Sequence, residues 1–140
     1  MNPNFILNFT PTGMIPTKKM TPHVPEQPDE IVEQVLEVVE LGVNMVHLHA
    51  RDAVTGVPTW HKDVYLKIIG PIRKAYPDLV ICASLSGRDF PEFEKRSEVL
   101  HLTGDLKPDF GSLTLSSLNF NRQASMNSPQ MIQDLASAML

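Results

Sequence analysis

The sequence predicts an α/β fold built on a parallel sheet, and three observations support this class. Short runs rich in β-branched and other apolar residues alternate with longer segments in which apolar residues recur at helical spacing. This alternation occurs four times along the 140 residues. Strand–helix–strand order is typical of right-handed crossovers in a parallel sheet, which is either doubly wound or closed as a barrel.

The first unit begins with an apolar run at 5–9, which predicts a strand, and continues with a long Thr/Pro/Gly-rich loop at 10–27. Pro28 follows this loop at a position typical of the first turn of a helix. Apolar residues then fall on one stripe up to Val39, and Gly42 stands where a C-terminal cap belongs. We therefore expect a well-defined amphipathic helix after the first strand.

The second unit contains a strand at 44–50, a turn at 52–56 and a helix at 61–75. Gly70 and Pro71 lie inside this helical segment. Because proline lacks a backbone N–H and its ring clashes with the preceding turn, we expect a kink or a break at this point.

The third unit has a strand at 79–84 and a helix at about 92–101. The fourth has a strand at 110–115 and a helix at 130–140, with Ser128 and Pro129 as the N-cap and the first helical residue. We expect two complete units of the same kind.

Four βα units are half of the eight in a TIM (β/α)₈ barrel, which needs about 250 residues. Four parallel strands alone would leave apolar edges and an unfilled barrel interior. We therefore expect residues 1–140 to form a single domain, the N-terminal half of a (β/α)₈ barrel, with about half of the fold outside this sequence.

The composition excludes several classes of function. Its 42% hydrophobic and 20% charged residues are typical of a globular domain, and the net charge of −4 comes without the basic stripe that nucleic-acid binding requires. No apolar run approaches the roughly 20 residues of a membrane span, and no basic segment marks a secretory signal. The single cysteine, Cys82, fits a reducing compartment. We expect a cytoplasmic protein with a small-molecule partner.

The strand at 44–50 carries the most informative residues. Side chains alternate across a strand, so His47, His49 and Arg51 share one face while the apolar residues between them take the other. Two imidazoles at positions i and i+2 can ligate Zn²⁺ or another divalent transition metal, with a third ligand from elsewhere. Hydrogen-bonded core histidines are the alternative interpretation.

Hydroxyl groups and a glycine follow the third and fourth strands, where a barrel places its active site. They are Ser84 and Gly87 after the third strand, and Ser112 and Thr114 at the fourth. Together they could bind a carboxylate, and the alternative is that they form turns and helix caps. The phosphate-binding, dinucleotide-binding and nucleophile-elbow glycine motifs are absent from the sequence, which argues against NTP hydrolysis, hydride transfer and serine hydrolase chemistry.

Several motifs resemble the β-keto acid cleavage enzyme family, whose first described member cleaves 3-keto-5-aminohexanoate. The similarity covers nearly the whole chain in order, through Val-His-Leu-His-Ala-Arg-Asp at 46–52, Thr-Gly-Val-Pro at 55–58, and the segments 77–81, 106–109 and 117–120. The resemblance implies a (β/α)₈ barrel, usually a homo-oligomer. It also implies a divalent ion, normally zinc, held by His47, His49 and a glutamate from the second half.

The resemblance further implies a retro-Claisen exchange, in which a β-keto acid and acetyl-CoA give acetoacetate and a new acyl-CoA. It places Ser84, Gly87, Ser112 and Thr114 around the substrate, and we add Arg51 at the end of the histidine strand. The groups that transfer protons belong to later strands of the family, so we expect no complete catalytic set within these 140 residues.

One position departs from the family member that cleaves aminohexanoate. Where that enzyme has a glutamate for the substrate's amino group, this sequence has Ile15. We therefore expect a substrate with a neutral or apolar acyl group.

Two other interpretations compete with this one. A metal-dependent hydrolase of the amidohydrolase type also uses His-X-His in a barrel, although there the motif usually lies on the first strand. Alternatively, the chain is an inactive, truncated half-barrel that only associates with other chains, and its size in solution would reveal this.

Overall fold

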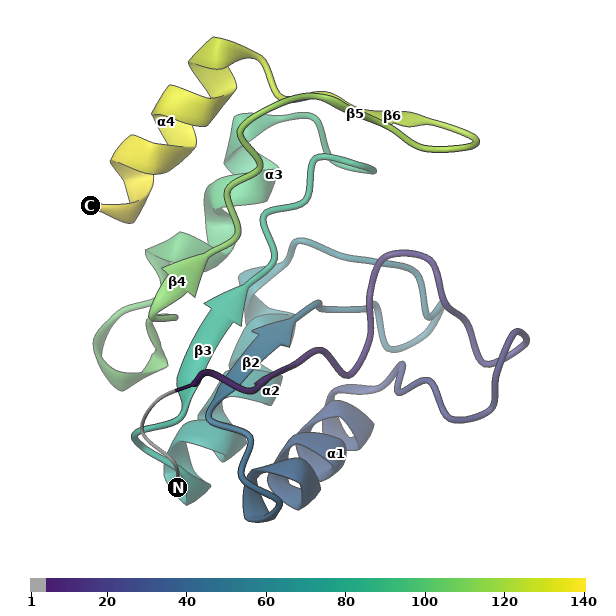
Figure 1. Cartoon of the computed structure of the whole chain (residues 1–140), viewed down its shortest axis with the longest axis vertical. Coiled ribbons are helices and arrows are strands. Elements are labelled where there is room, and N and C mark those ends of the chain that lie inside the picture. Colours follow the sequence, from purple (N-terminus) through teal and green to yellow (C-terminus); the bar gives the residue numbers. More distant parts are fainter. Residues whose placement is uncertain (1–4) are drawn as a thin grey trace.

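The computed structural model describes residues 5–140 and confirms the parallel sheet. Its strands are β1 (Asn8–Phe9), β2 (Met45–Leu48), β3 (Val80–Ala83) and β4 (Phe110–Gly111). All neighbouring pairs are parallel, and the spatial order β1-β2-β3-β4 is the order along the chain (Figure 1). A doubly wound sheet reverses its strand order at a switch point, whereas a barrel does not. The strand order therefore agrees with four consecutive βα units of a barrel.

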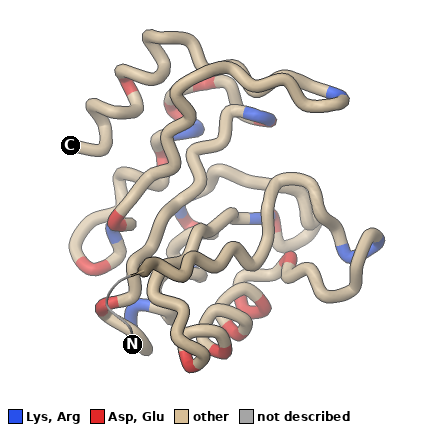
Figure 2. The backbone as a smooth tube through the Cα atoms, in the orientation of Figure 1, with Lys and Arg blue, Asp and Glu red and all other residues tan. Residues whose placement is uncertain are grey.

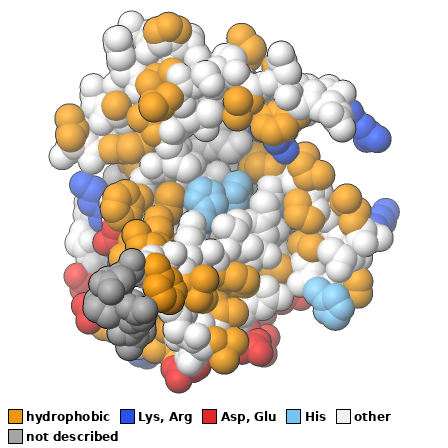
Figure 3. Space-filling view, in the orientation of Figure 1, with side chains coloured by type: hydrophobic (Ala, Val, Ile, Leu, Met, Phe, Trp, Pro, Cys, Tyr) orange, Lys and Arg blue, Asp and Glu red, His pale blue; other side chains and the backbone are white. Residues whose placement is uncertain are grey.

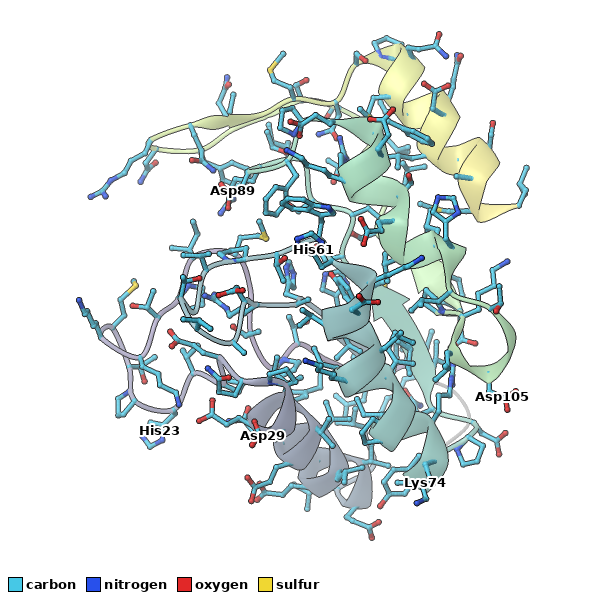
Figure 4. All side chains as sticks on the ribbon, turned by 180° about the vertical axis from the view of Figure 1, so that it is seen from behind. His23, Asp29, His61, Lys74, Asp89 and Asp105 are labelled. Carbon is cyan, nitrogen blue, oxygen red and sulfur yellow. The ribbon has the colours of Figure 1, made fainter. Side chains whose placement is uncertain are left out.

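The helices cover one face of this sheet. They are α1 (Pro28–Glu40), α2 (Lys62–Ala75), α3 (Phe93–Ser97) and α4 (Pro129–Met139), and two short 3₁₀ turns follow α3 at Glu98–His101 and Gly104–Leu106. Figure 1 shows α1, α2 and α3 behind the strands, and the reverse view in Figure 4 shows them in front. The opposite face, which lines the interior of a barrel, carries no helix in the part of the chain that the structure describes.

The core lies between the strands and the helices. Val46 and Leu48 of β2 and Ile81 and Ala83 of β3 are completely buried there. They pack in one cluster with aliphatic residues of α1 and α2, among them Ile31, Val35, Ile68, Ile69 and Ile72. Burying each larger side chain contributes about 1.5–3 kcal/mol, so this layer supplies most of the stability of the domain.

The predicted helix ends are confirmed. Pro28 is the first residue of α1, where the Gln27 and Glu30 side chains form a capping box. Gly42 follows the C-cap of α1 with φ of 102°, a conformation that favours glycine. At α4, the Ser128 hydroxyl accepts a hydrogen bond from the Met131 N–H at 3.1 Å.

The predicted break in the second helix is wrong, because α2 runs without interruption through Pro71, and the alternative, a kink, stays a prediction. Pro71 is exposed, and so is Lys67, whose carbonyl loses its helical hydrogen bond to the missing N–H. Water can hydrate that carbonyl on this side of the helix, whereas the buried Ile68, Ile69 and Ile72 hold the other side against the sheet.

All four strands are shorter than predicted: β2 and β3 contain four residues each of the expected 44–50 and 79–84, and the outer strands are the shortest. β1 contains only two residues of the expected 5–9, and β4 only two of 110–115, because each lies at an edge of the sheet and pairs on one side. The expected helix at 92–101 is divided into α3 and a 3₁₀ turn. A short antiparallel hairpin of β5 (Leu118–Asn119) and β6 (Ala124–Ser125) was not predicted, since two-residue strands carry no measurable periodicity.

Two long loops extend from the sheet toward the same side of the molecule (Figure 1). We call residues 10–27 the first arm and residues 117–126, which contain the hairpin, the second arm. Figure 2 shows Lys and Arg at the ends of both arms, while Asp and Glu line α1. Among residues 5–140, no helix has the length and hydrophobicity that crossing a bilayer requires.

Candidate metal and substrate site

His47 of β2 and His49, the first residue past its end, meet on the open face of the sheet. The Nε2 atoms of His47 and His49 lie 3.1 Å apart, and the rings are inclined at 63°. Figure 3 shows histidine side chains in a hollow near the middle of this face. The neighbouring residues Val46, Leu48 and Ala50 are buried on the helix side, so the predicted alternation along β2 is confirmed.

Both imidazoles are neutral at pH 7. Burial lowers the pKa of His47 below its ordinary value. Burial, together with the charges of His47, Arg51 and Arg88, lowers the pKa of His49 to about 3. Neutral imidazole is the form that binds metal ions, so these histidines need not lose a proton to do so.

The outer ring nitrogens of the pair have different surroundings. The Nδ1 atom of His47 lies 3.3 Å from the Sγ atom of Cys82, which stands directly beside it in the β2–β3 register. The buried Nδ1 atom of His49 has no hydrogen-bond partner among the described residues. A cavity of about 20 Å³ that His49 lines together with Tyr65 and Ser84 is large enough for one water molecule.

The pair fits a divalent metal ion. In a tetrahedral site with Zn–N bonds of about 2.0–2.1 Å, two nitrogen ligands stand about 3.3 Å apart. The observed Nε2–Nε2 separation of 3.1 Å is close to that value. No group of three His, Cys, Asp or Glu side chains suited to a metal occurs among residues 5–140.

Arg51 lies at the end of the same strand and is 1% exposed. Its guanidinium donates to the carbonyls of Gly13, Pro16 and Gly56, and its Nε–H donates to the Thr12 hydroxyl at 3.2 Å. These bonds fasten the first arm and the turn after β2 to the histidine strand. The structure thus shows Arg51 as an anchor of two loops, and substrate contact by Arg51 stays a prediction.

The predicted hydroxyl residues come together at the carboxyl edge of β3 and β4. The Ser84 N–H donates to the Leu48 carbonyl at 2.9 Å, which places Ser84 beside the end of the histidine strand. The Ser112 hydroxyl accepts from the Leu85 N–H at 3.0 Å and joins the two loops. Thr114 is half-buried a little further along.

Glycine is favoured at position 87 because other atoms of the protein lie where a Cβ atom would stand. A Cβ atom added to Gly87 would stand 2.7 Å from Nη1 of Arg96 and 3.2 Å from the Met126 carbonyl. Arg96 is 3% exposed and donates to the Leu85 carbonyl at 2.8 Å and to Oδ1 of Asn127 at 2.8 Å. This buried arginine therefore joins the loop that contains Ser84 and Gly87 to the second arm.

Cys82 and Arg96 were not predicted as parts of the site. Cys82 has the same strand parity as Ser84, so alternation alone places it on the open face. Arg96 carries no such signal, because its position depends on how α3 packs. The three other histidines, His23, His61 and His101, are exposed; Figure 4 shows His61 at the start of α2 and His23 on the first arm.

The strand order and the histidine pair at the carboxyl end of β2 define the class, namely a partial (β/α)₈ barrel with a metal-compatible site at its catalytic end. Residues 4–140 match the model of the beta-keto acid cleavage enzyme family. The chain belongs to this family, as its motifs predicted.

Curated relatives agree with this assignment. The 3-oxoadipate:acetyl-CoA acetyltransferase of Cupriavidus necator is 31% identical over 134 residues, which are 96% of this chain and 45% of that protein. The 3-dehydrocarnitine:acetyl-CoA trimethylamine transferase of Rhizobium meliloti is 28% identical over 99% of this chain and 52% of that protein. A 3-keto-5-aminohexanoate cleavage enzyme of Acetoanaerobium sticklandii is 30% identical, over 89% and 44%. The chain thus spans about half the length of these relatives.

Solved structures support the fold. The apo structure of ObcA superposes with a TM-score of 0.73 at 20% identity, covering 84% of this chain and 28% of that one. The binary complex of ObcA with oxaloacetate gives a TM-score of 0.71 at 22% identity, covering 80% and 28%. The similarity of fold confirms that this chain corresponds to the N-terminal part of an α/β barrel.

Proposed function

We propose that this chain is the N-terminal half of a metal-dependent enzyme that exchanges a β-keto acid with acetyl-CoA, giving acetoacetate and a new acyl-CoA. His47 and His49 would hold a divalent ion, normally zinc, and the remaining ligand and the proton-transfer groups would come from the other half of the barrel. We place the complete protein in the cytoplasm as a homo-oligomer.

The 3.1 Å approach of the two Nε2 atoms is the observation that carries this proposal. It occurs at the carboxyl end of a barrel strand, where barrel enzymes have their active sites. Family membership and two relatives named for acetyl-CoA support the reaction class and the co-substrate. The amidohydrolase alternative gains nothing from these comparisons.

Each group in this half has a role in binding. A bound divalent ion would polarise the keto oxygen and stabilise the negative charge that develops during C–C cleavage. Ser84 and Ser112, held at adjacent strand ends, offer hydroxyl donors for the substrate carboxylate. Gly87 would lie beside the substrate in the loop that follows Ser84, and Thr114 would contribute a further hydroxyl. Arg51 would act indirectly, through the loops that it holds.

The first arm would select the acyl group. Ile15 is 54% exposed on this arm, and the adjacent Met14 lines the small cavity next to His49. A substrate ammonium group that is buried needs a polar or charged partner. The apolar side chain of Ile15 offers none. We propose a neutral or apolar acyl substrate. Within the complete barrel, faster turnover of a 5-amino substrate than of its uncharged analogue would contradict this choice.

Metal stoichiometry tests the site in this chain. Purified protein would be titrated with Zn²⁺, alongside His47→Ala plus His49→Ala as the altered site and His23→Ala plus His101→Ala as the matched control. We expect saturable binding of one ion per chain, lost only in the first variant. Equal binding by all three proteins would contradict the site.

The reaction is tested in the complete barrel that contains this chain, with a β-keto acid and acetyl-CoA. We expect acetoacetate and a new acyl-CoA to form in equal amounts. Product release in the absence of CoA would instead support the hydrolase alternative.

The half-barrel architecture has its own test. Phe5, Ile6 and Leu7 are exposed next to β1, and Phe110 is exposed in β4, so both edges of the sheet present apolar side chains. Gel filtration of the isolated chain should therefore show self-association. A stable folded monomer would argue against the proposal that residues 1–140 are half of a closed barrel.

A further inference from the structure

We infer that Cys82 is a positioning residue that holds His47 in the tautomer needed for metal binding, whereas His49 must change its tautomer when the metal arrives. The inference deepens the proposed function and rests on its metal site. It follows from the hydrogen-bond partners of four ring nitrogens.

The Cys82 thiol has a single proton, and the structure gives the thiol as a donor to the Ala83 carbonyl. The Sγ atom of Cys82 lies 3.9 Å from the Ala83 carbonyl and 3.3 Å from Nδ1 of His47. When the thiol proton points to the carbonyl, a sulfur lone pair faces the imidazole and accepts from its Nδ1–H. His47 then carries its proton on Nδ1, and its Nε2 lone pair is directed into the site.

The short contact between the two rings fixes the second tautomer. Two Nε2 lone pairs 3.1 Å apart would repel each other, so one of these atoms donates to the other. With His47 protonated on Nδ1, the donor is Nε2–H of His49. This assignment leaves Nδ1 of His49 as an acceptor, and it is the one ring nitrogen of the pair without a partner among the described residues.

Metal binding needs a free lone pair on both Nε2 atoms. His47 already presents one, whereas His49 must move its proton from Nε2 to Nδ1. The 20 Å³ cavity lined by His49, Tyr65 and Ser84 offers space for a water molecule to accept that proton's hydrogen bond. In the metal-free protein His47 therefore already has the tautomer that binds a metal ion, whereas His49 does not. The hydrogen bond to Cys82 accounts for this difference.

The contact between His47 and Cys82 is fixed by the register of the sheet. His47 and Cys82 are directly paired in the parallel β2–β3 ladder, so both side chains project from the same face at the same level. Cys82 is 6% exposed and has little freedom to turn away. Partners of this kind, which orient a ligating histidine through its other nitrogen, typically change metal affinity by about 10–100-fold.

The direct test is a two-bond ¹H–¹⁵N correlation spectrum of the metal-free full chain at pH 8, with ¹⁵N-labelled histidine. We expect the Nδ1–H tautomer for His47 and the Nε2–H tautomer for His49, with only His49 changing after zinc is added. An Nε2–H tautomer of His47 in the metal-free protein would overturn the inference, whether or not zinc binds.

Three substitutions separate hydrogen bonding from packing. Cys82→Ser keeps an acceptor, Cys82→Val fills the volume without one, and Cys82→Ala removes both. We expect Cys82→Ser to keep the His47 tautomer and most of the zinc affinity. Cys82→Val and Cys82→Ala should mix the tautomers and weaken zinc binding by about 10–100-fold.

Backbone amide spectra would verify that each variant is folded. Wild-type affinity in a folded Cys82→Val protein would contradict the positioning role. If the wild-type chain shows the expected tautomers but binds no zinc, the proposed metal site fails while the hydrogen-bond assignment for Cys82 stands, so the two failures are distinguishable.

Discussion

The two faces of β2 differ in almost every physical property, although their residues alternate along one short strand. The helix side presents Val46 and Leu48, which are fully buried and belong to the apolar core cluster. The open side presents His47 and His49, which are partly buried and hydrogen-bond to each other. One face stabilises the fold, and the other carries polar groups, of which Nδ1 of His49 has no hydrogen-bond partner among residues 5–140.

Because the two faces differ in this way, the free energy of unfolding and metal binding can be changed separately by substitutions in this sheet. A substitution on the helix side should alter the free energy of unfolding and leave metal binding intact wherever the protein still folds. A substitution on the open side should do the opposite.

The largest effect is expected from Leu48→Ala. Truncating a fully buried leucine removes apolar contacts and leaves a cavity, which lowers the free energy of unfolding by about 2–5 kcal/mol. Urea denaturation measures this loss. Val54→Ala is the control, since Val54 is 93% exposed and should change stability by less than about 0.5 kcal/mol. Equal effects for the two variants would show that the buried side chains on the helix side of β2 do not determine the stability of the fold.

Zinc should stabilise the wild-type chain but not a chain altered on the open face. At a free concentration of 100 times Kd, a ligand that binds only the folded state adds about 2.7 kcal/mol. His49→Ala should gain nothing, because its site retains one imidazole. Thermal melts with and without zinc measure the difference, and a similar gain in both proteins would place the ion elsewhere.

Gly87→Ala should cost about 1–3 kcal/mol, because the new methyl group overlaps the buried Arg96 guanidinium and packing errors of this size carry such penalties. Gly13→Ala is a matched control: its added Cβ would meet only Pro16 Cδ, at the ordinary distance of 3.9 Å. Chemical denaturation of the two variants tests whether the Arg96 guanidinium excludes a side chain at position 87. Equal stabilities would show that the Arg96 side chain can move away from the new methyl group at little cost in free energy.

The smallest effect concerns Glu30, where the first arm joins the helix layer. A hydrogen bond from Lys18 lowers the pKa of Glu30 below its ordinary value, and backbone bonds from Gln27 and Glu26 add to this. The resulting stabilisation is complete above the pKa of the unfolded carboxyl, about 4.3, and is lost as the pH falls through the lower folded value.

Glu30→Gln should therefore reduce stability by about 0.5 kcal/mol at pH 7, and the difference from wild type should shrink toward pH 3. Paired melting curves across this range measure it. A difference that is independent of pH would mean that the carboxylate charge plays no part in the cap.

The sequence predicts most of the helix layer because its signals are local. Pro28 and Gly42 mark both ends of α1, and the alternation in β2 assigns His47 and Leu48 to opposite faces. The contact between His47 and Cys82 depends on the register of two strands that are 35 residues apart, which no local pattern contains. Arg96 reaches Gly87 only through the packing of α3, and Pro71 is tolerated only because its side of α2 is exposed.

The charges on the two arms have a kinetic consequence. The chain as a whole is negative, yet the first arm contains Lys18 and Lys19 and the second arm contains Arg122, while acidic residues line α1 (Figure 2). These basic side chains give the arms a local positive charge on the side of the molecule toward which both arms extend (Figure 2). Under the proposed function, an anionic keto acid and acyl-CoA would be attracted to that side, so their association rate should fall as ionic strength rises.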